Sequence, residues 1–414
     1  MKRTLIIICR LLVGALFVFS GFVKAIDPLG STYKIIDYFE AFGASCLEPA
    51  ALYAGALQNA VELAIGLCLI MGIRMRVTAW ALMLFMSFYT VLTFFLAIFN
   101  PVSDCGCFGD AIKLTNWQTF FKNLIIFVPT LIIFNARSAY RSFAGAALEW
   151  LYVALFFAGS LALSLHCYKH LPLLDFMPYH VGQHLPTAMS TPEGAPHDEY
   201  STTLIYAKDG KEQEFSDADF PWQDSTWVFV DSKSKLVKKG YTPPVHNFAI
   251  VHYEAGDITE EVLAAEYAFL LVAPKLEKVS LPDWEQVKNI ASFAKEKGYT
   301  FCALTSSTQG YASEFSNLHL LNFDFCSADE ATLKSMVRSH PGLVLLHRGT
   351  VVGKWSHLDI PPAEAFGENP LASNLNMLRQ ANENATGYAC IFACLAALLL
   401  LTLPGCKRKL TKWR

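Results

Sequence analysis

Two cysteines separated by a single residue, Cys105-Gly106-Cys107, carry the strongest chemical signal in the chain. Cysteines this close can bridge only in a strained ring, and the glycine between them supplies the backbone freedom that such a ring needs. Strained, exposed disulfides have high reduction potentials and are typical of labile, catalytic pairs. The spacing alone leaves three alternatives open: a redox pair, a structural disulfide or a metal site.

The residues around this motif do not favour reactive thiols. Asp104 and Asp110 flank it, and we expect their negative charges to raise the pKa of both cysteines. Lys113 is the cation nearby in the sequence that could oppose them. Whether the pair is active therefore depends on what the fold brings beside it.

Six apolar segments are long enough to be membrane spans, because a helix needs about 20 mostly apolar residues to cross a bilayer. Only 17% of the 414 residues are charged, against about a quarter in soluble domains. The net charge of −3 favours no nucleic-acid partner. The sequence therefore predicts a multi-pass protein surrounded by membrane lipid, with spans at Leu5–Ile26, Leu52–Ile73, Val77–Phe99, Trp117–Phe134, Leu148–Tyr168 and Ala385–Pro404.

The basic residues predict the orientation in the membrane. With six spans, the clusters Lys2/Arg3, Arg74/Arg76, Arg137/Arg141 and the tail 405–414 all fall on one side. Cytoplasmic segments carry such an excess of lysine and arginine. We therefore expect a bacterial inner-membrane protein with both termini in the cytoplasm and the region 169–384 in the periplasm.

Two cysteine-bearing loops then share the outer side, where disulfides persist. The loop 100–116 carries Cys105 and Cys107, and the loop 27–51 carries Cys46. Cys46 is the candidate resolving partner of the pair, and a buried or free thiol is the alternative.

Arg10 and Glu62 are charges within predicted spans, where charge is costly and marks a functional or paired residue. At 1.5 Å per residue, Arg10 lies roughly 8 Å and Glu62 roughly 16 Å from the inner ends of their spans. An arginine side chain can cover much of that difference. The two are interpreted either as a buried ion pair or as a proton or quinone site, with a snorkelling Arg10 as the third alternative. Lys24, near the outer end of its span, is expected to snorkel.

The predicted fold class is an α-helical membrane bundle with an α/β extracytoplasmic domain. Short loops in the first part of the chain favour a four-helix bundle. The expected order is a four-span unit at 1–145, a fifth span at 146–168, a linker and small β-unit at 169–239, an α/β domain at 240–384, a sixth span at 385–404 and a basic tail at 405–414.

Alternating strands and helices predict a mixed sheet covered by helices in the α/β domain. Tyr267–Val272 is a continuous apolar strand. Its expected successors are a helix at Pro282–Lys297, a strand at Tyr299–Leu304, a helix at Ser313–Leu318, a strand at Leu320–Cys326, a helix at Asp329–Arg338 and a hairpin of Leu343–Leu346 with Val351–Trp355.

This order resembles the thioredoxin/peroxiredoxin family. The entry segment Gly240–Ile250 with Gly256-Asp-Ile258 is similar to the family's first hairpin, and His340-Pro341-Gly342 stands where the family has a cis-proline. The family's redox cysteines follow the first central strand, but here the window 273–283 reads APKLEKVSLPD and has no cysteine. The resemblance therefore implies a binding or positioning module without dithiol chemistry of its own. Cys302 and Cys326, in neighbouring predicted strands, are interpreted as buried structural thiols, with a bridge or redox pair as the alternative.

The membrane unit resembles the DoxX superfamily, in the branch of the methylamine-utilisation protein MauE. The resemblance rests on the run Arg10–Lys24, the following Asp27-Pro28-Leu-Gly30, Glu62 with Gly66, and the segment Asp104–Asp110. MauE proteins are implicated, with a thioredoxin-like partner, in disulfide formation during maturation of a periplasmic amine dehydrogenase. The resemblance implies a fused arrangement of that kind, while the use of methylamine does not follow.

The leading functional hypothesis is assistance to thiol–disulfide exchange or to maturation of extracytoplasmic proteins, with Cys105 and Cys107 cycling and a quinone as candidate electron acceptor. The rival is a non-enzymatic scaffold whose outer domain binds a partner subunit. Whether the chain is an enzyme stays open between the two. A metal accessory protein is the third alternative, and no metal site is expected, because the histidines of the linker lack a zinc-binding spacing: His166, His170, His180 and His184.

Overall fold

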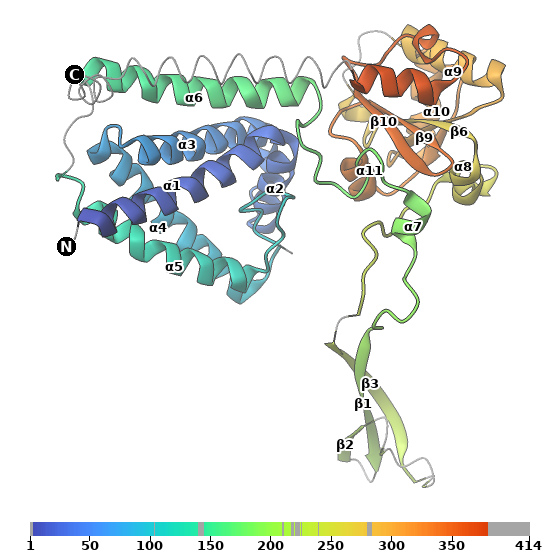
Figure 1. The fold of residues 1–414 in the computed structure, drawn as a ribbon. Helices are drawn as coiled ribbons and strands as arrows, with labels where there is room; N and C mark the ends of the chain where they lie inside the picture. The colour runs from blue at the N-terminus through green and yellow to red at the C-terminus, as the bar shows by residue number, and fades with distance from the viewer. Residues whose placement is uncertain are drawn as a thin grey trace.

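The computed structural model describes residues 3–102, 104–139, 145–208, 211–216, 219, 224, 226–238, 240–279 and 284–379. The predicted sixth span 385–404 and the basic tail lie outside these residues. Figure 1 shows three parts: a helical bundle, an α/β module beyond one end of it, and a narrow sheet that extends from the linker between them.

Five helices are long and apolar enough to cross a membrane. They confirm five of the six predicted spans, and no end differs from its prediction by more than two residues. These helices are α1 (Arg3–Ile26), α3 (Ala51–Met71), α4 (Met75–Phe99), α5 (Asn116–Asn135) and α6 (Ala146–Lys169). Four of them form the bundle, and α6 runs alongside it toward the α/β module (Figure 1).

The connection between α1 and α3 contains a helix that the sequence analysis did not anticipate. Helix α2 (Pro28–Ala41) starts where Asp27 caps it, since the Asp27 carboxylate accepts a hydrogen bond from the Gly30 amide at 2.8 Å. Pro28 occupies the first helical position, which suits its fixed backbone angle. A short 3₁₀ helix, η1 (Ser45–Ala50), follows and leads into α3.

Glycines bring α1 and α3 into close antiparallel contact. A Cβ atom on Gly66 would lie 2.6 Å from the Val18 amide nitrogen, and one on Gly21 would lie 2.6 Å from the Leu63 nitrogen. Small residues allow this approach between membrane helices. The contact fixes the register of the two helices, so the C-terminal end of α1 faces the middle of α3 around Leu63.

A three-stranded antiparallel sheet occupies the region between the linker and the α/β module. Its order is β2-β1-β3. The strands are β1 (Glu199–Lys208), β2 (Lys211–Ser216) and β3 (Val228–Lys238). The preceding linker includes the short helix α7 (Leu185–Met189).

The α/β module is built on a seven-stranded mixed sheet of order β10-β9-β6-β7-β8-β4-β5. Strands β6, β7 and β8 are parallel, and β9 and β10 run antiparallel at one side. The strands are β4 (Val251–His252), β5 (Gly256–Asp257), β6 (Tyr267–Val272), β7 (Thr300–Thr305), β8 (Phe325–Ser327), β9 (Gly342–His347) and β10 (Thr350–Ser356).

Helices cover this sheet, and every residue of β6 is buried, as expected for a strand packed on both faces. Leu270 faces one apolar cluster and Phe269 the other. The helices are α8 (Thr259–Ala264), α9 (Glu285–Lys297), α10 (Gln309–Leu318) and α11 (Glu330–Met336), with short 3₁₀ turns η2 (Leu276–Lys278) and η3 (Ala363–Phe366).

Two details of the module bear on the sequence analysis. The His340–Pro341 peptide bond is cis, as predicted. The third strand is shorter than predicted: α10 runs to Leu318, and Leu320 has a positive φ of 49°, so the chain is still turning where the strand was expected to begin. Helix α11 also ends earlier, at Met336, which leaves Arg338 in the connection to β9.

Candidate functional site

Residues 104–110, which we call the cysteine loop, connect α4 to α5 through a tight turn. Gly106 and Gly109 have positive φ angles of 63° and 54°, and the Gly109 amide donates to the Gly106 carbonyl at 3.0 Å. This turn brings the two thiols together, with the Sγ atoms of Cys105 and Cys107 2.8 Å apart. Both cysteines are free thiols in this structure.

Four side chains from the bundle hold the loop in place. The Tyr38 hydroxyl donates to the Cys105 carbonyl at 2.6 Å, and the Ser20 hydroxyl donates to the Cys107 carbonyl at 2.6 Å. Thr119, at the start of α5, lies 3.3 Å from Cys105 through its hydroxyl. Lys34 forms an ion pair of 3.1 Å with Asp104, and its stem packs on Gly106.

Both cysteines line a cavity of about 60 Å³ in the half of the bundle next to the cysteine loop. Its walls come from α1 to α5 and from the cysteine loop. Charged and phenolic groups share these walls with apolar side chains. They are Lys24, Lys34, Tyr38, Glu62, Tyr89 and Lys122.

Glu62 reaches the cavity, but its partner is not the one predicted. The carboxylate forms a buried ion pair with Lys24, and the side chains are only 6% and 7% exposed. Lys24 therefore does not snorkel. The antiparallel register explains this, because it places the C-terminal end of α1 against Glu62.

Arg10 lies at the other end of α3. Its guanidinium packs against Gly72, where an added Cβ would come within 2.6 Å of a guanidinium nitrogen. Gly72 is ten residues beyond Glu62, which is about 15 Å along a helix. The predicted pairing of Arg10 with Glu62 is therefore wrong. Arg10 does not line the cavity that contains the cysteines.

The electrostatics of the cysteine loop favour one reactive thiol. The hydrogen bond from Cys107 lowers the pKa of Cys105 to about 6, against the effect of burial, with further help from Thr119 and the positive charge of Lys122. The same shared hydrogen bond and burial raise the pKa of Cys107. A thiolate at Cys105 near neutral pH is the nucleophilic form.

The cations that act on the pair come from helices and not from the adjacent sequence. Lys122, on α5, and Lys24, on α1, favour the thiolate form. Lys113, which the sequence suggested, is exposed and lies 3.8 Å from Asp110. Lys122 follows Thr119 by three residues, so the two lie about one turn apart on the same face of α5. This polar stripe on an otherwise apolar span is the sequence signal that could have identified both residues as neighbours of the cysteines.

Cys46 does not join this cluster. It is exposed in η1 and is not among the residues that line the cavity. The hypothesis that it resolves the Cys105–Cys107 pair rests on its loop alone.

The cavity has room for water and not for a quinone ring. An apolar cavity that takes benzene has about 150 Å³, whereas a single water needs about 10–15 Å³. The 60 Å³ beside Glu62 therefore suits a few waters in this conformation. Within the described residues, no group of three or more His, Cys, Asp or Glu side chains is arranged to hold a metal ion.

Comparison with known proteins identifies the bundle. Residues 2–136 match the family described as methylamine utilisation protein MauE. The membrane unit is MauE-like. Residues 200–239, which include the three-stranded sheet, match a domain of unknown function, DUF8463. No curated protein and no solved structure gives a significant match. The MauE-like unit thus contains the cysteine loop, the Lys24–Glu62 pair and the cavity between them.

Proposed function

We propose that this MauE-like membrane protein assists thiol–disulfide exchange during maturation of extracytoplasmic proteins, with Cys105 and Cys107 as the exchanging pair. The observation that carries the proposal is the shared hydrogen bond of the two thiols, 2.8 Å apart, which lowers the pKa of Cys105 to about 6. Cys105 is then the attacking thiol and Cys107 the resolving one.

In the proposed exchange, the disulfide of a client protein accepts the two electrons that Cys105 and Cys107 give up. The Cys105 thiolate attacks one client sulfur, which forms a mixed disulfide and releases a client thiolate that takes up a proton. Cys107 then loses its proton and attacks the Cys105 sulfur, which releases the second client thiolate. The client gains two electrons, and Cys105–Cys107 becomes a disulfide. The reverse sequence oxidises a client dithiol. A second protein on the same side restores the pair: a dithiol protein reduces it after a client has been reduced, and a disulfide protein oxidises it after a client has been oxidised.

The resolving step needs a proton acceptor, since burial keeps Cys107 protonated. Glu62 lines the same cavity as Cys107, and a few waters bridge such a space. We assign Glu62 as the acceptor and Lys24 as its buried ion-pair partner. This role keeps Glu62 as a site residue that takes up a proton, while the two electrons pass to the disulfide of the client protein.

The α/β module is assigned as a thioredoxin-like positioning domain on the periplasmic side of the inner membrane. The order β10-β9-β6-β7, with β9 antiparallel to its parallel neighbours, and the cis His340–Pro341 bond support this. The basic clusters of the sequence support the orientation, with both termini cytoplasmic.

A non-enzymatic scaffold is the second candidate. The absence of cysteine from the window 273–283 favours it, because the module then contributes binding only. In that case Cys105 and Cys107 form a structural bridge, and the module holds a partner subunit.

The redox state of the pair in cells separates the two candidates. Cells are quenched in acid, free thiols are tagged, and the peptide containing both cysteines is read by mass spectrometry with and without reductant. A mixed dithiol and disulfide population that shifts when mild external oxidant is added supports exchange. Cys107→Ser should then trap clients as mixed disulfides, with Cys105→Ser/Cys107→Ser as control. A pair that stays wholly oxidised or wholly reduced contradicts exchange and supports the non-enzymatic scaffold.

A further inference from the structure

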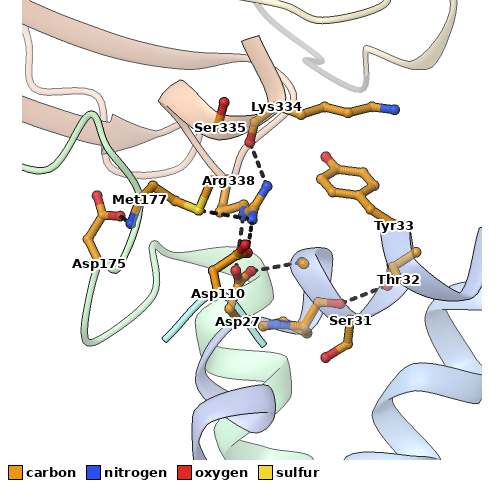
Figure 2. Close-up of polar contacts among 12 residues, drawn as sticks. Asp27, Ser31, Thr32, Tyr33, Asp110, Asp175, Met177, Lys334, Ser335 and Arg338 are labelled. Carbon is orange, nitrogen blue, oxygen red and sulfur yellow. Dashed lines mark hydrogen bonds and ion pairs between the residues drawn. The ribbon is translucent and has the colours of Figure 1, made fainter. Parts of the chain in front are cut away.

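A single arginine of the α/β module reaches across to the membrane unit. Arg338 lies in the connection from α11 to β9, next to the cis His340–Pro341 bond, and its side chain is 7% exposed. Its Nε donates to Asp27 at 3.0 Å, and one terminal nitrogen donates to Asp110 at 2.7 Å. Figure 2 shows the guanidinium between these two carboxylates.

The remaining donors of Arg338 are also satisfied. Nη1 donates to the Lys334 carbonyl at 2.7 Å. Nη2, which binds Asp110, also lies 3.3 Å from the Met177 sulfur (Figure 2). Burial lowers the pKa of Arg338, but Asp27 and Asp110 outweigh that effect and raise it. A guanidinium so enclosed depends on its anionic partners, because an unpaired buried charge is expensive.

Each of the two carboxylates belongs to an element that holds the thiols. Asp110 is the last residue of the cysteine loop, three residues after Cys107. Asp27 caps α2 with one oxygen and binds Arg338 with the other. Helix α2 in turn carries Tyr38, which donates to Cys105. Arg338 therefore joins the cysteine loop to the helix against which it is held.

Other contacts of the same edge of the module support this docking. His340 Nε2 and the Tyr33 hydroxyl on α2 share a hydrogen bond of 2.8 Å. Lys278, which follows β6 where thioredoxin-like proteins carry their cysteines, pairs with Glu48 of η1. The edge next to the cis-proline thus faces the chain's own membrane unit.

From this arrangement we propose that the α/β module is a latch on the cysteine loop: docking through Arg338 holds Cys105 and Cys107 in their shared arrangement, and undocking releases them. The inference rests on the proposed function, of which it is the regulation. It also revises the role of the module, whose proline edge binds the membrane unit in cis and not a client.

Release of the α/β module should change the surroundings of Cys105 and Cys107. Without Arg338, Asp110 loses its buried cationic partner and keeps a negative charge near the thiols, and the turn that pairs the thiols loses one anchor. Both changes disfavour a thiolate at Cys105. Its reactivity should therefore begin at higher pH, while the opened loop admits reagents more readily.

The test is the pH dependence of alkylation in the full-length protein in lipid nanodiscs. The rate at Cys105 is followed with iodoacetamide by peptide mass spectrometry, for the unaltered chain and Arg338→Gln. We expect the midpoint to rise by about one pH unit or more, and the plateau rate at high pH to increase. Other groups that face the pair are unchanged by the substitution: Lys24, Lys34, Asp37, Tyr38, Glu62, Tyr89, Asp104, Lys113 and Lys122.

The matched control is Arg348→Gln, at an exposed turn between β9 and β10 of the same module. It should leave midpoint and plateau as they are. An Arg338→Gln profile that superimposes on the unaltered one overturns the latch. If that variant does not fold, Arg338→Lys carries the test, because lysine keeps the charge but cannot engage both carboxylates with a planar fork. An unchanged Arg338→Lys profile then overturns the proposal as well.

This readout is independent of client exchange. A chain whose pair never cycles in cells can still show the midpoint shift, which refutes the exchange function and keeps the latch. A chain that cycles but shows no shift keeps the function and loses the latch.

Discussion

Within the described residues, two pairs of cysteines lie close together in different surroundings. Cys105 and Cys107 hydrogen-bond to each other in a loop beside a polar cavity. Cys302 and Cys326 also interact through a hydrogen bond, but they lie on the parallel strands β7 and β8 within an apolar cluster. Closeness of two thiols is therefore not enough to make a reactive pair.

The charges around each pair account for the difference. Lys122 and Lys24 act on the first pair and favour a thiolate. In the second pair the acidic neighbours Glu261 and Asp324 oppose a thiolate, although the hydrogen bond with Cys302 lowers the pKa of Cys326. The hydrogen bond with Cys326 and burial raise the pKa of Cys302. Its sulfur behaves as a small apolar group of the core.

The most direct test of this comparison removes one thiol from each pair. Cys105→Ser should lower the rate of disulfide exchange with a quenched fluorescent disulfide peptide by at least about 100-fold, because the nucleophile is gone. Cys302→Ser should leave that rate within about twofold of the unaltered chain. Equal losses in the two variants would place the reactive pair elsewhere.

Breaking the Lys24–Glu62 ion pair beside Cys105 and Cys107 should lower the stability of the protein. Lys24→Met leaves the Glu62 carboxylate buried without its partner, and we expect a loss of about 3–5 kcal/mol in the free energy of unfolding. Denaturant unfolding in mixed micelles measures it. Lys24→Met/Glu62→Leu should recover most of the loss, and a double variant no more stable than the single one contradicts the pairing.

The pH profile sharpens the comparison further. Alkylation of Cys105 should rise with pH and reach half its maximum near pH 6, since only the thiolate reacts. Cys107→Ala removes the hydrogen-bond donor and should raise this midpoint by about two units, toward the ordinary value of a thiol. Cys302 should stay unmodified over the same range, and its alkylation in folded protein would show that the second pair is accessible.

The smallest effect is expected in the core pair. Cys302→Ala removes a buried sulfur and should lower the free energy of unfolding by about 1 kcal/mol, with little change in exchange rate. Thermal unfolding of the purified protein measures the first quantity. A loss of several kcal/mol would indicate a bridge between Cys302 and Cys326.

Much of the fold follows from local patterns in the sequence. The five described spans and β6 were predictable, because apolar length and a run of buried residues depend on nearby residues, and the cis-proline was predicted from the resemblance to the thioredoxin/peroxiredoxin family. Helix α2 was missed, although Asp27-Pro28 is a helix start signal, because the loop was treated only as a connection between spans.

The sequence by itself determined that the chain holds a MauE-like bundle with two cysteines one residue apart, since both are properties of a continuous segment. The partners of those cysteines were decided only by tertiary structure. Lys24 reaches Glu62 because glycines set the register of α1 against α3. Arg338 reaches Asp110 across 228 residues of chain. Helix packing brings Lys24 to Glu62, and domain docking brings Arg338 to Asp110. The local sequence around each residue specifies neither contact.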